Sequence, residues 1–176
     1  MKLFLITCLL SFGLFTTVQA QDNLFPVIKG YGAIVPVPFE TEKPDPKSEY
    51  KLIYELSFRY DDKAKFYRGL DYAARIVNAH AYAGVPKENL QMVIVISSSA
   101  TPLVINSEEY KKRFKADNPN TEVLDTLMAA GVKIVVCGQS MVKQDIVPNQ
   151  VHKGISLAAS RITATSDLLN KGYHIF

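Results

Sequence analysis

The residue with the most distinctive chemistry is Cys137, which follows the largely apolar run 132–136 and is itself followed by Gly138. The next residues, 139–144, are expected to form a short helix. Free N–H groups and the positive end of the helix dipole at a helix start favour an anion. A cysteine in such a place has a lowered pKa, and its thiolate is the nucleophile. The alternative is an inert thiol that packs as a small hydrophobe, because free cysteine is among the most buried residue types.

Polar residues also follow the other predicted strands. Arg59, Ser97 and Arg161 each come shortly after a run of apolar residues. The carboxyl ends of parallel strands meet at one edge of a sheet, and ligands collect there. The expected site therefore has Cys137 as its catalytic residue and a group of possible substrate- or anion-binding residues around it, namely Gly138, Gln139, Ser140, Arg59, Ser97 and Arg161.

Other kinds of chemistry have no support in the sequence. It contains neither of the glycine-rich phosphate-binding patterns G-x-G-x-x-G and G-x-x-x-x-G-K-[ST]. His80, His152 and His174 lack the spacing of a metal site, so no metal and no cofactor are expected. No basic stripe is interleaved with aromatic residues, which argues against a nucleic-acid partner.

The composition is that of a folded globular protein. The chain has 176 residues, of which 48% are hydrophobic and 21% charged, and its net charge is +3. These proportions exclude intrinsically disordered and low-complexity classes. Collagen-like and solenoid architectures are excluded by the lack of a repeat. The length predicts a single domain.

The first twenty residues have the three-part layout of a secretory signal peptide. Lys2 gives a positive start, residues 3–15 are mostly apolar, and Val18 and Ala20 are the small residues of a cleavage site. We therefore expect an exported protein, periplasmic or secreted, with no membrane span after the signal is removed. Cleavage after Ala20 would also remove Cys8, leaving Cys137 as the single cysteine and excluding an intramolecular disulfide.

Residues 21–48 are predicted to form an N-terminal arm. They contain five of the nine prolines, which exclude a regular helix and favour extended backbone. Apolar residues alternate with these prolines, and a purely solvated linker would not need them. The arm is expected to lie over the domain or over a neighbouring subunit.

Residues 49–176 are predicted to form an α/β domain. Apolar runs that are typical of strands alternate with segments of helical periodicity. The expected strands are 52–56, 90–96, 132–136, 155–158 and 173–176, and the expected helices are 61–82, 107–114, 121–130, 139–144 and 160–171. Ser107 is expected to cap the second of these helices, and either Ser160 or Thr163 the last one. Residues 97–102 are expected to form a loop. Such alternation predicts a three-layer sandwich with a mostly parallel sheet of about five strands.

Three segments carry a resemblance to a known family: 131–140, which contains Cys137, the strand 154–158 and the ending 172–176. Residues 65–70 and 78–79 look similar too. From about residue 50 to its end, the chain resembles the DsrE/DsrF-like family, which includes the TusD-type sulfur-relay subunits. The resemblance implies a flavodoxin-like sandwich that assembles into trimers or hexamers.

The resemblance also implies a role for Cys137, which matches the cysteine that carries sulfur as a persulfide in that family. The implied partners are a sulfane-sulfur donor and an acceptor protein or small thiol. Relay proteins of the family act in the cytoplasm and do not need a Pro-rich arm, so an exported member would use other partners. The expected function is an exported sulfur carrier. The alternatives are a non-catalytic homo-oligomeric binding or assembly module with a buried, inert Cys137, and a redox sensor that forms an intersubunit disulfide.

Overall fold

The computed structural model describes residues 23–176, so the predicted signal peptide lies outside the described residues. The strands are β1 (Tyr50–Leu56), β2 (Leu90–Ile96), β3 (Lys133–Cys137), β4 (Ser156–Ala158) and β5 (His174–Ile175). The α-helices are α1 (Arg68–Tyr82), α2 (Ser107–Phe114), α3 (Thr121–Ala129), α4 (Gly138–Val142) and α5 (Arg161–Asn170). Short 3-10 helices are η1 (Lys87–Asn89), η2 (Ser98–Val104) and η3 (Pro148–Gln150).

The five strands form one sheet in the order β4-β3-β2-β1-β5, and every neighbouring pair is parallel. The central strands β2 and β3 consist largely of β-branched and other apolar residues, which suits strands covered on both faces. The prediction of an α/β fold with a parallel sheet of about five strands is confirmed.

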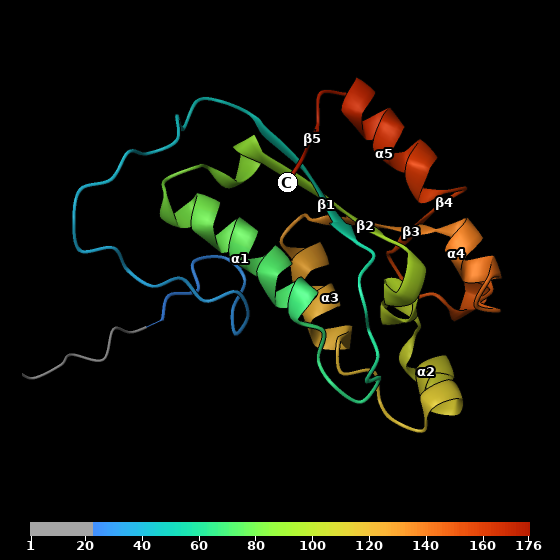
Figure 1. Cartoon of the computed structure of the whole chain (residues 1–176). Helices are drawn as coiled ribbons and strands as arrows, with labels where there is room; N and C mark the ends of the chain where they lie inside the picture. The colour runs from blue at the N-terminus through green and yellow to red at the C-terminus, as the bar shows by residue number, and fades with distance from the viewer. Residues whose placement is uncertain (1–22) are drawn as a thin grey trace, which may run out of the picture.

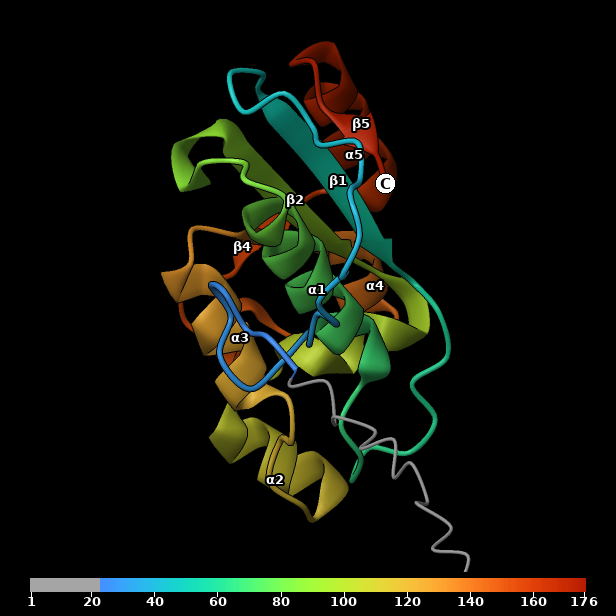
Figure 2. The same cartoon turned by 90° about the vertical axis from the view of Figure 1, so that its left-hand side faces the viewer.

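Helices cover both faces of this sheet (Figure 1). The helices α1 and α3 pack on the face that carries the larger apolar core, and Figure 2 shows α1 in front of the sheet. On the opposite face α5 packs against a smaller cluster that contains Ile53, Val93, Val95, Val135 and Leu168. The three-layer prediction is confirmed. Within residues 23–176, no helix combines the length and apolar character that a membrane span needs.

The path of the chain decides where α5 begins. Because β4 and β5 lie at opposite edges of the sheet, the connection between them crosses the sheet, and α5 is part of it. Its first turn therefore lies just beyond the end of β4, beside the last residue of β3. The ends of β2, β3 and β4 and the first turn of α5 thus share one edge.

The predicted start of the first helix, at Asp61 and Asp62, is wrong, because α1 begins only at Arg68. The side chain of Asp62 accepts a hydrogen bond from the backbone of Ala64 in a turn, instead of capping a helix. Tyr67 stays extended, and its N–H donates to the side chain of Asn120 at 2.8 Å. This long-range bond holds the chain out of helical geometry up to the residue before α1.

Two further local predictions need correction. The cap of α2 is Asn106, whose side chain accepts the N–H of Glu109, and not Ser107. The segment after β2, predicted as a loop, contains the 3-10 helix η2. By contrast, Ser160 caps α5 as one of the two predicted candidates, and its hydroxyl accepts the N–H of Thr163.

The first part of the arm is fastened to α1 by Asn78, which is fully buried. Its side-chain oxygen accepts the N–H groups of Val27 and Ile28, and its amide donates to the carbonyls of Ile28, Tyr31 and Gly32. The fully buried Ile28 belongs to the large core. The arm thus begins as part of the domain, and the segment after it loops around the outside of α1 before it enters β1 (Figure 1).

We expect Asn78→Ala to lower the free energy of unfolding by about 2–4 kcal/mol, because it leaves several buried backbone groups of the arm without partners. Urea denaturation measures this change. The control is Asn149→Ala, since Asn149 is exposed and its side chain makes no hydrogen bond in the described structure. Equal stabilities of the two variants would contradict the role assigned to Asn78.

Candidate functional site

A polar pocket of about 150 Å³ lies at the carboxyl edge of the sheet and contains Cys137. The segments that follow β2, β3 and β4 all contribute to it, as the parallel topology requires. Its walls are formed by Ser97, Ser98, Cys137, Gln139, Ser140, Lys143, Ser160, Arg161 and Ile162.

The sulfur of Cys137 sits where two helices begin. Cys137 ends β3 and is the residue before α4, while its strand partner Ala158 ends β4 shortly before α5. The hydroxyl of Ser140 and the backbone N–H groups of Ser140, Arg161 and Gln139 lie near the sulfur and act on its pKa as hydrogen-bond donors. Only 5% of the surface of Cys137 is exposed. The thiol is thus nearly covered, yet it faces donors and a pocket.

Two opposing effects act on the pKa of Cys137. Burial raises the pKa, because the charged form loses its hydration. The hydroxyl and backbone N–H donors lower the pKa, because they stabilise the thiolate, and their combined effect is the larger. The net result is a pKa below that of an ordinary thiol, so that more thiolate is present at neutral pH than in a free cysteine.

The hydroxyl of Ser140 is oriented by its own donor. The N–H of Ser98 donates to the Ser140 Oγ at 3.0 Å, which leaves the hydroxyl hydrogen for the sulfur. Ser98 adopts a left-handed backbone conformation with φ of 52°. Its carbonyl accepts hydrogen bonds from the side chains of Gln144 and Thr101, both at 2.8 Å, and these hold the unusual conformation.

The start of α5 is anchored by Glu55, which lies on the α5 side of β1. One carboxylate oxygen accepts a hydrogen bond from Arg161 Nη1 at 2.9 Å, and the other accepts one from Thr165 Oγ1 at 2.6 Å. These two bonds link the first and second turns of α5 to the sheet. They therefore fix the position of the Arg161 N–H that points at the sulfur.

Gly138 permits the close approach of β4 to the start of α4. A Cβ atom at this position would lie 2.9 Å from the carbonyl oxygen of Ala158. The N–H of Gln139 also bonds to the carbonyl of Ala159 at 3.3 Å. Any larger residue at 138 would push the β4 end, and with it the Arg161 N–H, away from the sulfur.

The structure brings most of the residues named from the sequence to one place. Ser97, Gln139, Ser140 and Arg161 line the pocket with Cys137, and Gly138 lies directly beside it.

Arg59 is not among the lining residues. Its side chain is 90% exposed, and its Nε lies 3.5 Å from Asp61 Oδ2. The physical reason is the strand order. Because β2 separates β1 from β3, the segment after β1, which contains Arg59, does not reach the Cys137 pocket.

The sequence analysis did not identify Glu55 as a residue that supports the site. A lone carboxylate within the mostly apolar run 52–56 is the signal that could have identified it. A partly buried carboxylate needs a partner. Arg161, which was expected at the same edge of the sheet, is a cation that could supply it.

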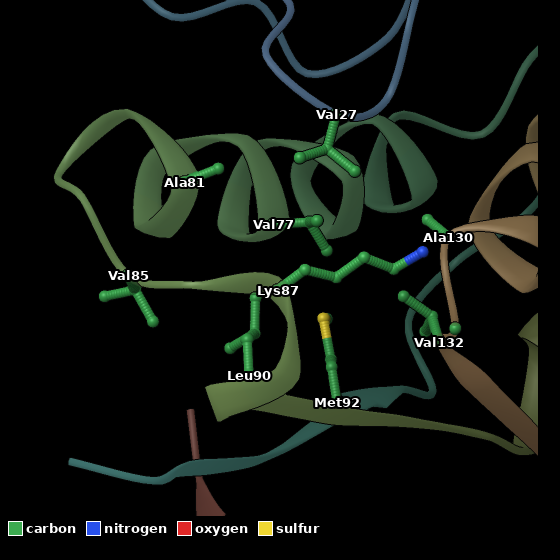
Figure 3. A pocket seen from close by; sticks show the side chains of 10 residues that line it. Val27, Val77, Ala81, Val85, Lys87, Leu90, Met92, Ala130 and Val132 are labelled. Atoms are coloured by element: carbon green, nitrogen blue, oxygen red, sulfur yellow. The ribbon is translucent and has the colours of Figure 1, made fainter. Parts of the chain in front are cut away.

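A second cavity of about 60 Å³ lies at the opposite end of the strands, between α1 and the starts of β2 and β3 (Figure 3). Its walls are almost wholly apolar, and one of them, Val27, comes from the arm. Its single charged residue is Lys87, whose side chain extends across the cavity (Figure 3). It has no thiol, hydroxyl or carboxylate side chain, so the Cys137 pocket is the candidate reactive site. Nowhere in residues 23–176 do three or more His, Cys, Asp or Glu side chains gather as a metal site requires.

Residues 61–176 match the model of the DsrE/DsrF-like family. The chain belongs to the DsrE/DsrF-like family. Similar solved structures show the same fold. A protein of unknown function, MTH1491 from Methanobacterium thermoautotrophicum, is 13% identical with a TM-score of 0.55, and the match covers 73% of this chain and 98% of that one. The ychN protein from E. coli is 16% identical with a TM-score of 0.51, covering 72% and 99%.

The search of curated proteins found no match. Membership of the DsrE/DsrF-like family points to sulfur relay as the general role of the chain.

We expect Ser140→Ala to raise the pKa of Cys137, because it removes one of the donors that stabilise the thiolate. The thiolate fraction at neutral pH then falls, so alkylation by iodoacetamide at pH 7 slows several-fold and its pH profile moves to higher pH. The control is Ser99→Ala, since the Ser99 hydroxyl donates to the carbonyl of Phe58 and not to the sulfur. Identical pH profiles for Ser140→Ala and the wild type would contradict this assignment.

Proposed function

We propose that the protein is an exported sulfur carrier that accepts sulfane sulfur as a persulfide on Cys137 and passes it to an acceptor. The observation that supports this most is the set of four hydrogen-bond donors converging on a nearly buried sulfur. A purely structural thiol needs no such donors, whereas a sulfur that carries negative charge does. The predicted signal peptide supports export.

The lack of a second thiol supports a carrier over a self-contained oxidoreductase. Cys137 is the single cysteine of the described residues, and it is not in a disulfide. A disulfide oxidoreductase needs a resolving thiol, which residues 23–176 do not contain. A persulfide on Cys137 would therefore be discharged to another molecule, either an acceptor protein or a small thiol.

Incubation of the purified protein with inorganic polysulfide or a low-molecular-weight persulfide tests this proposal. We expect peptide mapping by mass spectrometry to find one or more added sulfur atoms on the peptide that contains Cys137. Cys137→Ser is expected to show none. The absence of added sulfur in the wild type with every donor, or its presence on the same peptide of Cys137→Ser, would refute the proposal.

The near burial of Cys137 favours a second candidate, a non-catalytic homo-oligomeric binding or assembly module with an inert thiol. The two functions differ in the reactivity of the native thiol. A carrier reacts with small sulfane donors in the folded state, whereas an inert thiol reacts only as fast as the protein unfolds. Comparing the labelling rate with the unfolding rate distinguishes them.

A homo-oligomer, such as a trimer or hexamer, is also part of the proposal. Three exposed apolar residues support it: Val142 of α4, Leu157 of the edge strand β4 and Ile162 at the start of α5, with exposures of 76%, 48% and 68%. The segments that contain these residues border the Cys137 pocket, and Ile162 lines it. Exposed apolar side chains beside a pocket suit an interaction surface.

Size-exclusion chromatography with light scattering tests the oligomer. We expect Leu157→Lys to lower the mass towards that of a monomer, because it places a charge on the open edge of the sheet. Leu169→Lys, at a similar exposure of 45% near the far end of α5, is expected to leave the mass unchanged. A wild type that is already monomeric would contradict the proposal.

A further inference from the structure

The pocket contains a buried hydroxyl that has no partner. In residues 23–176, Ser97 Oγ is the one buried side-chain nitrogen or oxygen atom without a hydrogen bond. Ser97 is 1% exposed, so bulk water does not satisfy it. Buried polar groups in folded proteins are nearly always paired, and each exception calls for an explanation.

Ser97 lies next to Cys137 across the sheet. The register of β2 and β3 ends with Ile96 opposite Val136, so the next two residues, Ser97 and Cys137, are neighbours. Val95 and Val135 face α5, and side chains alternate along a strand. The side chains of Ser97 and Cys137 therefore lie on the same face, and adjacent strands are about 4.8 Å apart.

The donors of the unmodified sulfur are already provided without Ser97. Ser140, Gln139 and Arg161 hydrogen-bond to Cys137, and Ser97 is not among the groups that shift the pKa of that thiol. Ser97 contributes to the wall of the same pocket, as does the exposed Lys143, whose ammonium group forms no ion pair in the described part of the chain. A donor and a cation are thus present in the pocket but unused by the thiolate.

A persulfide would change which atom needs these groups. When the outer sulfur is added, the negative charge moves from Sγ to the terminal sulfur, which extends into the pocket. The pocket, of about 150 Å³, has room for this atom. We propose that Ser97 Oγ donates a hydrogen bond to the terminal sulfur of the Cys137 persulfide. The buried hydroxyl would then gain its hydrogen-bond partner only when the protein carries sulfur. This proposal rests on the proposed function and specifies its binding residue.

The loading step balances without an added oxidant. The Cys137 thiolate attacks the outer sulfur of a low-molecular-weight persulfide, R–S–S⁻. A new bond forms between Sγ and that sulfur, and the S–S bond of the donor breaks. The electron pair leaves with R–S⁻, and the charge on the transferred sulfur is retained as Cys137–S–S⁻. Ser97 would stabilise the product of this step and not its reactant.

The test is the equilibrium between protein thiol and protein persulfide at a fixed ratio of glutathione persulfide to glutathione, measured by intact mass. We expect Ser97→Ala to lower the ratio of persulfide to thiol about tenfold or more, as the loss of a hydrogen bond to a charged group predicts. Ser97→Thr keeps the hydroxyl and should restore most of the loading. Ser99→Ala, three residues from β2 in the same segment, should load like the wild type.

Two further measurements separate this role from a merely structural one. The pH profile of Cys137 alkylation should be the same in Ser97→Ala and the wild type, because Ser97 does not bond to Sγ. The unloaded Ser97→Ala protein should be at least as stable as the wild type, because the variant removes an unpaired buried hydroxyl.

Equal loading of Ser97→Ala and the wild type would overturn the role of Ser97 while leaving the sulfur carrier intact. A lower loading that is accompanied by a shifted alkylation profile would also overturn it, because the variant would then have disturbed the thiol itself. A wild type that forms no persulfide at any donor ratio would overturn both proposals.

Discussion

The site depends on one balance, between the cost of burying the Cys137 sulfur and the hydrogen bonds that it receives. Burial alone would keep the thiol neutral, since a thiolate loses its hydration there. The hydroxyl of Ser140 and backbone N–H groups at the starts of α4 and α5 reverse this outcome and lower the pKa. A sulfur that is covered and yet ionises more readily than an ordinary thiol is shielded from stray reactions while it remains a nucleophile, which is what the proposed carrier of a labile sulfur atom requires.

Much of the surrounding structure serves to place these donors. Glu55 ties the first turns of α5 to the sheet through Arg161 and Thr165. The lack of a side chain at Gly138 lets β4 approach the start of α4. The left-handed Ser98 directs the Ser140 hydroxyl to the sulfur. None of these groups needs to react, but each fixes a distance to the one atom that would. The sheet topology brings them together, because α5 has to start where β4 ends.

The sequence was informative wherever local pattern determines the structure. The apolar runs of β2 and β3 and the alternation with helices predicted the parallel α/β sheet, and the strand–Cys–Gly–helix order predicted donors beside Cys137. The sequence-based predictions failed where a residue or strand far away in the sequence determines the local structure. The late start of α1 follows from the bond between Tyr67 and Asn120, and the position of Arg59 follows from the strand order. The hydroxyl of Ser97 is unpaired because of the strand register and the packing around it, and neither can be predicted from a single segment of the sequence.

The most direct test of this balance is the ionisation of Cys137 itself. The ultraviolet absorbance of the thiolate can be followed against pH as the difference between the wild type and Cys137→Ser, in the native and in the denatured state. We predict that the native thiolate appears at lower pH than the thiolate of the denatured chain, because the donors outweigh burial only when the protein is folded. A native thiol that ionises at the same pH as the denatured chain, or at a higher one, would contradict the central claim.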